Sequence, residues 1–458
     1  MLTNHKLDDD TELTSENLAE YLPQLHSASA IEISDLIMSR PHAEGLLIFN
    51  AISEEKAVVV FEYLHFKSQM EILYSLSQPR VAKLLNALSP DDRTTLLEGL
   101  SSDLSSQLIQ TLSPQEREIS TRLLSYPKDS VGRLMTTDYI AVKLDWSIQK
   151  VLDYIREKGH DSETVNVIYA IDDKGLLIDD FRIRQLLISP LQIKLEEISD
   201  HKFIALKVLE SQEDAIRIFR KYDRTALPVV DSKNTLLGIV TFDDIMAVST
   251  EEDTDDIQKI GGVEALRYPY MEISFPALIQ KRAGWLVLLF CVQLLTATAM
   301  SYFEDEISKA VVLVLFLPLI ISSGGNAGSQ ASSLIVRALA LGEISWEDWW
   351  RISKRELLSG LVLGSLLGLI GFIRVVAWSM FSNIYGPHWL LVALTISFSV
   401  LSVVLLGTLS GALMPLVLRR FKFDPATASA PLVATCVDVT GIVIYFNVAM
   451  WFLQGVLL

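Results

Sequence analysis

The stretch 318-PLIISSGGNAGSQASSLIVRALALGE-343 places small and polar residues inside a long apolar segment. No residue from Ala310 to Val336 is charged, and the segment exceeds the roughly 20 residues that a helix needs to cross a bilayer. The run from Ser322 to Gln330 would nevertheless make a poor lipid-facing surface, because glycines invite a helix to break or to pack closely. Two interpretations follow, a tight helix crossing or a segment that lines a water-filled path. The path is favoured because Asn326 and Gln330 both need polar partners.

Five apolar segments of this kind predict five membrane-spanning helices. They cover residues 284–303, 310–336, 357–380, 389–418 and 426–457. Basic residues gather before the first span, between spans two and three, and between spans four and five: Lys281, Arg282, Arg351, Lys354, Arg355, Arg419, Arg420 and Lys422. The positive-inside rule then places the N-terminal half in the cytosol and the C-terminus outside. We expect a multi-pass protein of the cytoplasmic membrane, with the lipid bilayer as a partner.

The fifth span contains a carboxylate, Asp438, and no charged residue follows it. An ionised carboxylate inside a membrane costs at least about 2.5 kcal/mol and usually faces a bundle interior or an aqueous path. A protonated, structural aspartate is one interpretation. A cation site, with Thr435 and Thr440 as neighbouring hydroxyls, is favoured because the only basic residue inside a span is the distant Arg374.

The net charge of −17 belongs to the first part of the chain. From Gly284 onward the sequence has 9 acidic and 9 basic residues, so residues 1–283 hold the whole excess. Such acidity repels nucleic acid and attracts cations, so we expect no nucleic-acid partner; the alternative is that the charge only aids solubility. Residues 1–14 have no apolar signal core and are expected to be disordered. Cys291 and Cys436 lie in apolar segments and predict no disulfide framework.

A 12-residue period organises residues 15–127. An aliphatic residue and a serine recur in step at Ile52-Ser53, Leu76-Ser77, Leu88-Ser89, Leu100-Ser101, Leu112-Ser113 and Leu124-Ser125. Each serine is expected to cap the helix that follows, with Pro90 and Pro114 at first helical positions and Glu116 completing a capping box with Ser113. Helices of one to two turns cannot bury an apolar face alone. The period therefore predicts an all-α domain of stacked helices, a superhelical solenoid.

A second repeat predicts two α/β units, at residues 128–190 and 191–250. Residues 139–144, YIAVKL, match residues 203–208, FIALKV, and each copy reads as strand, helix, strand, strand, helix. In the second copy Thr241 and Asp244 are spaced to hydrogen-bond ribose hydroxyls, whereas Arg182 and Gln185 stand there in the first. An adenine nucleotide such as ATP at the second copy and a motif without a ligand both stay open.

Residues 251–283 predict an acidic connecting helix between these units and the membrane. Hard divalent cations bind through several carboxylate oxygens and bridge surfaces that would otherwise repel each other. The candidate ligands of a regulatory metal here and nearby are Asp223, Asp243, Asp244, Glu251, Glu252, Asp255 and Asp256. The alternative is an acidic linker without a metal site.

The pattern P-(x)5-G-G-N-x-G-x-Q followed by LIVRALALGE closely resembles the MgtE family of magnesium channels and transporters. The resemblance extends over nearly the whole chain, through the helical domain, a pair of cystathionine-β-synthase-type (CBS) domains, and a five-helix membrane domain at residues 284–458. It implies that residues 251–283 form a plug helix, which closes the pore when magnesium binds between the cytosolic domains. It also implies that spans two and five line the pore, with hydrated magnesium at Asp438 near the Ala434 carbonyl.

This resemblance predicts a magnesium-selective channel or transporter rather than an enzyme, with Mg²⁺ both transported and regulatory. Magnesium sheds water reluctantly and prefers octahedral oxygen coordination, so we expect a homodimer that places two Asp438 side chains on its axis. Asn326, Ser329 and Ser333 are the further pore candidates; the two serines are spaced i, i+4. Many relatives carry asparagine where this chain has Ser329, so that contact departs from the family pattern.

Three alternatives stay open. A CBS-regulated carrier of another divalent cation would use the same site. A carrier of an anion or osmolyte would need basic or aromatic residues in the membrane, and Asp438 argues against it. A membrane-tethered sensor that conducts nothing would leave both Asp438 and the small polar run unexplained. No catalytic constellation is evident in the sequence.

Overall fold

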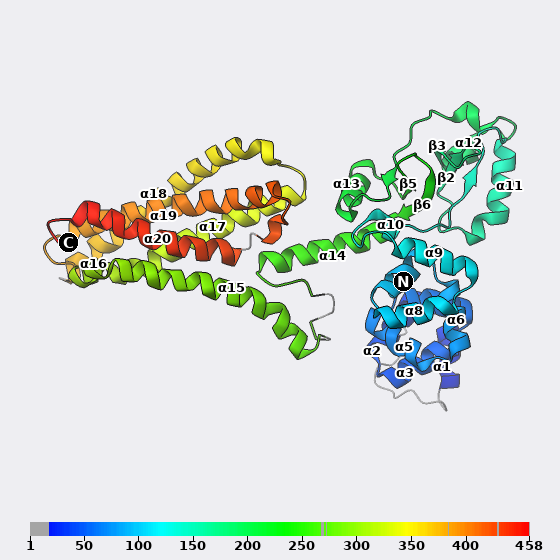
Figure 1. The fold of residues 1–458 in the computed structure, drawn as a ribbon, viewed down its shortest axis with the longest axis horizontal. Coiled ribbons are helices and arrows are strands. Elements are labelled where there is room, and N and C mark those ends of the chain that lie inside the picture. The colour runs from blue at the N-terminus through cyan, green and yellow to red at the C-terminus, as the bar shows by residue number, and fades with distance from the viewer. Residues whose placement is uncertain (1–17, 267–269, 272, 383, 428–429, 458) are drawn as a thin grey trace. The chain divides into compact units, whose positions relative to one another are not determined.

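The computed structural model describes residues 18–266, 270–271, 273–382, 384–427 and 430–457. It divides into two units, one up to Ser249 and one from Thr250 onward, and each is described here by itself (Figure 1). The expected disordered segment, residues 1–14, lies outside the described residues.

Short helices build the first part of the first unit. They are α1 (Leu18–Ser27), α2 (Ala30–Ser39), α3 (His42–Ala51), α4 (Glu54–Glu62), α5 (Phe66–Ser75), α6 (Gln78–Ala87), α7 (Pro90–Glu98), α8 (Ser102–Thr111) and α9 (Pro114–Leu124). Their apolar faces meet in one continuous core, in which Ile33, Phe49, Phe61 and Leu85 are almost completely buried. No helix of this length is stable alone, so stacking supplies the stability, as the period predicted.

The 12-residue period predicted most of the helix starts correctly. Serines occupy the N-cap positions of α4, α6, α7, α8 and α9, namely Ser53, Ser77, Ser89, Ser101 and Ser113. Three of these serines, Ser53, Ser89 and Ser113, accept a backbone N–H of the first turn. Pro90 and Pro114 are the first residues of their helices, as expected.

Two details of that prediction were wrong. Ser125 ends α9 and caps no following helix. Glu116 does not complete a capping box with Ser113, because its carboxylate pairs with the guanidinium of Arg93. The Ser113 N–H donates instead to the side-chain oxygen of Asn86, at 2.8 Å. A buried arginine from a neighbouring helix outcompeted the local bond.

The second part of the first unit consists of two α/β units with the same topology. The first holds β1 (Ala141–Val142), α11 (Ile148–Lys158), β2 (Val167–Ile171), β3 (Leu177–Arg182) and α12 (Ile183–Ile188). The second holds β4 (Leu206–Lys207), α13 (Gln212–Tyr222), β5 (Ala226–Val230), β6 (Leu236–Thr241) and α14 (Phe242–Ile260). In each sheet the first strand runs parallel to the second, and the second runs antiparallel to the third. The predicted internal repeat is confirmed.

Short elements link these parts, namely α10 (Val131–Leu134), η1 (Gly159–Asp161) and η2 (Leu195–Ile198). Helix α14 follows β6 directly and continues without a break to Ile260. The acidic residues from Asp243 to Asp256 therefore all lie on one helix, which begins before residue 251.

The second unit contains the five predicted apolar helices. They are α15 (Phe275–Tyr302), α17 (Leu317–Ala340), α18 (Trp349–Phe381), α19 (Trp389–Arg420) and α20 (Ala430–Leu453), with α16 (Glu304–Lys309), η3 (Val311–Phe316), η4 (Trp346–Asp348) and η5 (Pro425–Thr427) between them. Each of the five is long and apolar enough to cross a membrane. Helices α17, α18 and α20 pack along α19, whereas α15 packs on α20.

Glycines set the distance between α17 and α19. A Cβ atom on Gly328 would lie 2.9 Å from the carbonyl oxygen of Gly407, and Gly324 is in equally close contact with the same helix. Helix α17 stays continuous through these glycines. The tight-crossing interpretation therefore accounts for Gly324 and Gly328, whereas Asn326 lies on an exposed face of the single chain.

Candidate cation sites

Asp438 lies on α20 between α15 and α17. Its Oδ2 atom accepts a hydrogen bond from Nε2 of Gln293 on α15, at 3.2 Å. Its Oδ1 atom lies 3.9 Å from the position that a Cβ of Gly325 on α17 would occupy. The carboxylate is partly exposed in the single chain, and no ion pair among the described residues includes it. Asp438 is thus a carboxylate held by neutral neighbours.

Two further predicted pore residues, Ala434 and Ser329, lie in the contact between α17 and α20 next to Asp438. Ala434 is one turn before Asp438 and faces Gly325, whose Cβ would lie 3.4 Å from that of Ala434. One turn further along α17, Ser329 Oγ donates to the carbonyl of Ala430, at 3.1 Å. Helix α17 therefore presents Gly325 and Ser329 to the side of α20 that carries Asp438.

The remaining pore candidates bond within their own helices. Ser333 Oγ donates to the carbonyl of Ser329 at 3.0 Å, and Asn326 Nδ2 donates to Ser322 Oγ at 3.4 Å. The hydroxyls of Thr435 and Thr440 likewise donate to carbonyls of α20. The structure does not bring these groups to Asp438 by a hydrogen bond, although each hydroxyl keeps lone pairs that can accept one from water.

Sequence reasoning missed Gln293. Residues from Gly284 to Tyr302 contain no charged side chain, and Gln293 is the one carboxamide among them. A carboxamide in a membrane span needs a polar partner, because leaving it unbonded in an apolar environment costs several kcal/mol. The single carboxamide in an otherwise apolar span was therefore a signal in the sequence. Its partner, Asp438, could be named only from the packing of α15 on α20.

A second group of carboxylates lies in the first unit. We call it the acidic cluster: Glu62, Asp91, Asp92, Glu163, Asp243 and Asp244. Asp91 and Asp92 begin α7, Asp243 and Asp244 begin α14, Glu62 ends α4, and Glu163 follows η1. Both helix starts lie within electrostatic reach of each other and of Glu163. The cluster therefore brings together residues of the helical domain and of both α/β units.

Burial and the charges of neighbouring carboxylates disfavour the ionised forms of five members of this cluster: Glu62, Asp91, Asp92, Glu163 and Asp244. Burial, and next the charge of Asp92, raise the pKa of Glu62 to about 7. Burial raises the pKa of Asp244 to about 6, even though the Thr241 hydroxyl donates to its carboxylate at 2.5 Å. Burial also raises the pKa of Glu163 to about 7, and the charge of Asp244 adds to that shift. An added cation would relieve this repulsion.

Asp91 is the most deeply buried member of the cluster. It is 6% exposed, and its Oδ1 atom has no hydrogen-bond partner among the described residues. Burial first, and the charges of Asp244 and Asp92 next, raise its pKa well above the usual range. Across the described ranges, no three His, Cys, Asp or Glu side chains converge on one point as a preformed metal site. The cluster is a region of negative charge rather than a finished coordination shell.

The other predicted regulatory ligands lie elsewhere. Glu251, Glu252, Asp255 and Asp256 follow on later turns of α14, and Asp223 ends α13 in a left-handed conformation with φ 48°. Of the predicted set, only Asp243 and Asp244 belong to the acidic cluster. Sequence reasoning missed the other four members, although the Asp91-Asp92 pair at a capped helix start was visible.

Within the second unit, the end of α14 is tied to the membrane helices. Lys259 Nζ lies 2.8 Å from Oδ2 of Asp424, in the loop between α19 and α20. Glu264 pairs with Lys281 at 3.3 Å. Gly262, at φ 74°, packs so closely on the indole of Trp285 that a Cβ would lie 2.6 Å from it. These contacts hold the end of α14 and the residues after it against the loop between α19 and α20 and against α15.

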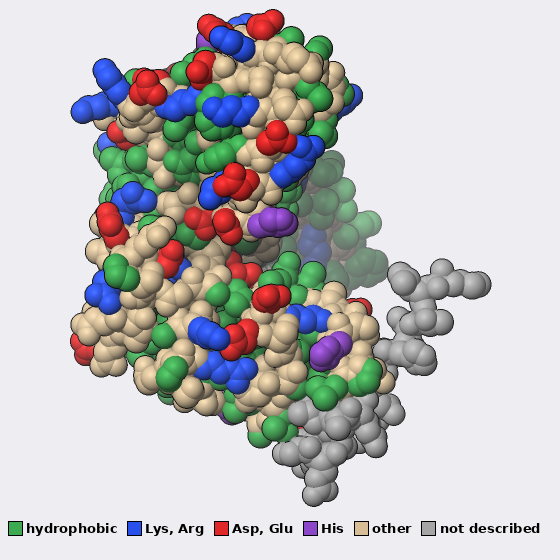
Figure 2. Space-filling view, turned by 90° about the vertical axis from the view of Figure 1, so that its right-hand side faces the viewer, with side chains coloured by type: hydrophobic (Ala, Val, Ile, Leu, Met, Phe, Trp, Pro, Cys, Tyr) green, Lys and Arg blue, Asp and Glu red, His purple; other side chains and the backbone are tan. Residues whose placement is uncertain are grey.

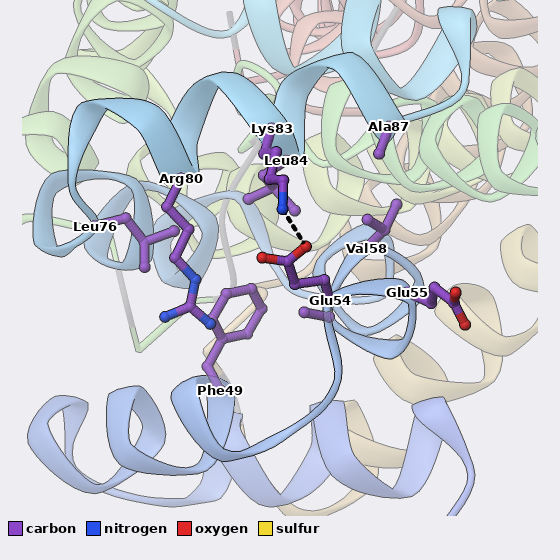
Figure 3. A pocket seen from close by; sticks show the side chains of 10 residues that line it. Phe49, Glu54, Glu55, Val58, Leu76, Arg80, Lys83, Leu84 and Ala87 are labelled. Atoms are coloured by element: carbon purple, nitrogen blue, oxygen red, sulfur yellow. Dashed lines mark hydrogen bonds and ion pairs between the residues drawn. The ribbon is translucent and has the colours of Figure 1, made fainter.

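The first unit also has a charged surface and a cavity outside the acidic cluster. Figure 2 shows acidic and basic side chains interspersed over the face of the first unit that it draws. A cavity of about 260 Å³ lies among α3, α4 and α6 (Figure 3). Its walls are mainly apolar, and the Lys83–Glu54 ion pair lies across it at 2.6 Å. None of the predicted site residues lines this cavity.

Comparison with known proteins places the chain among transporters. Family models match the MgtE intracellular N domain at residues 12–129, a CBS domain at 195–251, and the MgtE divalent cation transporter domain at 317–448. A magnesium transporter MgtE of Thermus thermophilus is 35% identical over 343 residues, which cover 75% of this chain and 74% of the relative. A magnesium transporter MgtE of Bacillus subtilis is 29% identical, and the match covers 84% of each chain.

A solved structure is also similar to about half of the chain. The cytosolic domain of the Mg²⁺ channel MgtE in complex with ATP is 29% identical, covers 51% of this chain and 97% of that structure, and has a TM-score of 0.49. A helical N-terminal domain, a CBS pair and five apolar helices together define a multi-pass membrane protein of the transporter class. The chain belongs to the MgtE family.

Proposed function

We propose that the chain conducts Mg²⁺ across the cytoplasmic membrane as a homodimeric channel and that cytosolic Mg²⁺ closes it. The observation that carries the proposal is Asp438, a carboxylate in an apolar helix whose hydrogen-bond partner among the described residues is a neutral amide. Such a group at membrane depth belongs to an ion path far more often than to a packed core. The relatives named above as magnesium transporters support the choice of ion.

At the pore site, the ion would meet oxygen ligands in the arrangement that Mg²⁺ prefers. Asp438 supplies the charge, and the Ala434 carbonyl and the Ser329 hydroxyl line the same side of the path. Mg²⁺ holds its water shell tightly, so these groups would contact bound water rather than replace the whole shell. Asn326 and Ser333 would contact the shell further along α17.

The proposed dimer follows from the site and from α15. One carboxylate per chain is a weak site for a divalent ion, and a two-fold axis supplies a second. The most apolar part of α15 buries no residue within the single chain. That face needs lipid or a second copy, and a second copy would also enclose the Asp438 side of α20.

Closure would begin at the acidic cluster. At low cytosolic Mg²⁺, repulsion between the start of α7 and the start of α14 would loosen the first unit. Mg²⁺ bound near Asp91, Asp92 and Asp244 would remove that repulsion, because hard cations bridge carboxylates. The Oδ1 atom of Asp91 is buried and has no hydrogen-bond partner among the residues that the structure describes, which supports a ligand there.

Helix α14 would pass this change to the membrane helices as the plug helix. It is continuous from Asp244 to Lys259, and Lys259 pairs with Asp424. The later carboxylates, Glu251, Glu252, Asp255 and Asp256, are proposed as further Mg²⁺ ligands, together with Asp223. The positive-inside rule puts the first unit in the cytosol and the C-terminus outside.

A nucleotide at Thr241 and Asp244 stays a prediction with less support. The two groups expected to bind ribose are hydrogen-bonded to each other, and Thr241 is 5% exposed. Asp244 also belongs to the acidic cluster, where the neighbouring carboxylates favour a cation. We therefore assign Asp244 to metal rather than to ATP.

Uptake into vesicles tests the proposed function. The purified chain is reconstituted with a trapped magnesium dye, and external Mg²⁺ is added alone or with competing Mn²⁺, Co²⁺ or Ni²⁺. We expect saturable Mg²⁺ entry that stops when the Mg²⁺ on the cytosolic face rises. Entry no faster than in protein-free vesicles would favour a non-conducting sensor, and preference for a competing ion would favour a carrier of another divalent cation.

A further inference from the structure

We infer that Gln293 is a positioning and selectivity residue of the Asp438 site. The inference rests on the proposed function and deepens it. Gln293 Nε2 donates to Asp438 Oδ2 at 3.2 Å, across the contact between α15 and α20. The inference concerns what that single bond does to the other carboxylate oxygen.

The hydrogen bond from Gln293 makes the two carboxylate oxygens of Asp438 different from each other. Oδ2 has a committed donor, whereas Oδ1 faces α17 and lies 3.9 Å from the Cβ position of Gly325. Because Gly325 has no side chain, α17 places no side-chain atom of that residue against Oδ1. A carboxylate without the Gln293 bond would rotate about its Cβ–Cγ torsion and present either oxygen.

Gln293 suits this role chemically because it is a neutral donor. A lysine or arginine there would neutralise Asp438 and cancel its attraction for a cation. A carboxamide N–H leaves the negative charge in place while stabilising the ionised form, because hydrogen bonds to charged acceptors are the stronger ones. The partly exposed position of Asp438 weakens this bond, since water competes for the same oxygen.

A fixed carboxylate matters more for Mg²⁺ than for a larger ion. Mg²⁺ demands near-ideal octahedral geometry, whereas Ca²⁺ accepts 6–8 ligands at longer and more variable distances. A rotating Asp438 could therefore still attract Ca²⁺ but would fit the rigid hydrated Mg²⁺ poorly. Gln293 would thus set the preference for Mg²⁺ over Ca²⁺ more than the maximal flux.

Substitutions in vesicles test this inference on the full chain. Gln293→Met keeps length and volume and removes the donor, and Gln293→His restores a ring N–H in its place. The control is Asn447→Leu, because the Asn447 carboxamide donates to the Val443 carbonyl of its own helix, at 2.7 Å, and to no other described residue. The measurements are the half-saturating Mg²⁺ concentration, the maximal flux and the Mg²⁺ to Ca²⁺ flux ratio.

We expect Gln293→Met to raise the half-saturating concentration about three- to tenfold, the range that loss of one such hydrogen bond gives. The flux ratio should fall by a similar factor, and the maximal flux should stay within about twofold. Gln293→His should recover most of the ratio. Kinetics of Gln293→Met equal to those of Asn447→Leu would overturn the inference, as would loss of the ratio in Gln293→His.

A parallel Asp438→Asn preparation separates failure of the proposed function from failure of the role assigned to Gln293. Unchanged flux in Asp438→Asn removes the site itself and the proposed function with it. Collapsed flux in Asp438→Asn with parental ratios in Gln293→Met overturns the role of Gln293 alone. If Gln293→Met fails to assemble, the flux ratio of Gln293→Leu, which is also neutral and lacks the donor, decides the question in the same way.

Discussion

Asp244→Asn should make the first unit less dependent on both pH and Mg²⁺. Folding raises the pKa of Asp244 from 3.8 to about 6, chiefly through burial. A carboxyl with a raised pKa contributes stability that is complete below its unfolded pKa and lost as pH rises through its folded pKa. In the parent without divalent cation, the first unit should therefore weaken as pH rises from about 4 to about 6.

The magnitude follows from the size of the shift. A rise in the pKa of Asp244 from 3.8 to about 6 corresponds to about 3 kcal/mol, because a tenfold change in proton affinity is worth about 1.4 kcal/mol. Asp244 keeps part of its surface in water, so screening reduces the expected loss to about 1–2 kcal/mol. The asparagine side chain has no charge and can still accept the Thr241 hydrogen bond, so this loss should disappear in Asp244→Asn.

Hydrogen exchange measures the effect in the intact protein. Peptides from α7 and from the start of α14 are followed with chelator and with millimolar Mg²⁺, on either side of the Asp244 pKa. The parent should gain protection from Mg²⁺ at the higher pH and little at the lower one, where protons replace the cation. Asp244→Asn should be protected at both without Mg²⁺. Equal Mg²⁺ responses in parent and variant would refute the role of Asp244 in the cluster.

Three further changes test other contacts. Arg93→Met should cost about 3 kcal/mol in thermal unfolding, because the buried guanidinium bonds two carbonyls and Glu116; an unchanged transition would contradict this. Lys259→Glu should weaken closure by Mg²⁺ in vesicles, and adding Asp424→Lys should restore it; normal closure in the single variant would remove the pair from gating. Gly328→Ala should disrupt assembly in size-exclusion chromatography, whereas Gly284→Ala, whose Cβ meets nothing closer than 4.0 Å, should not; equal elution profiles would contradict the packing.

Local and periodic features of the fold were predictable from the sequence. The serine period fixed most of the short helices, and the offset between residues 139–144 and 203–208 predicted two equal α/β units. Runs without charge predicted all five apolar helices. These features depend on residues close together in the chain, where caps, turns and apolar period decide the structure.

Contacts between distant segments were not predictable in the same way. The acidic cluster joins Glu62, Asp91, Glu163 and Asp244, which are spread over more than 180 positions, and composition alone pointed only to the α14 end. Arg93 gives a second example of a long-range contact that could not be predicted from the sequence. Its long-range pair with Glu116 overrode a local capping box whose sequence pattern was correct.

The central residue of the proposed pore site, Asp438, was predictable from the sequence, whereas its neighbour Gln293 was not. Asp438 could be singled out because it is the one charged residue in an apolar span. Placing a carboxylate in a membrane costs free energy, so such a residue usually has a function. Gln293 gave a weaker signal of the same kind, because an amide is cheaper to bury than a carboxylate. Which span lies beside α20 depends on helix packing, so the partner of Asp438 could not be named from the sequence.

Flux through Asp438→Asn tests the central claim most directly. The substitution keeps the shape and most hydrogen bonds of the side chain and removes the charge that offsets partial dehydration of the ion. With insertion and oligomeric state equal to the parent, we expect Mg²⁺ entry into vesicles to collapse, or selectivity to relax toward monovalent ions. A folded Asp438→Asn protein with parental flux and parental selectivity would contradict the account.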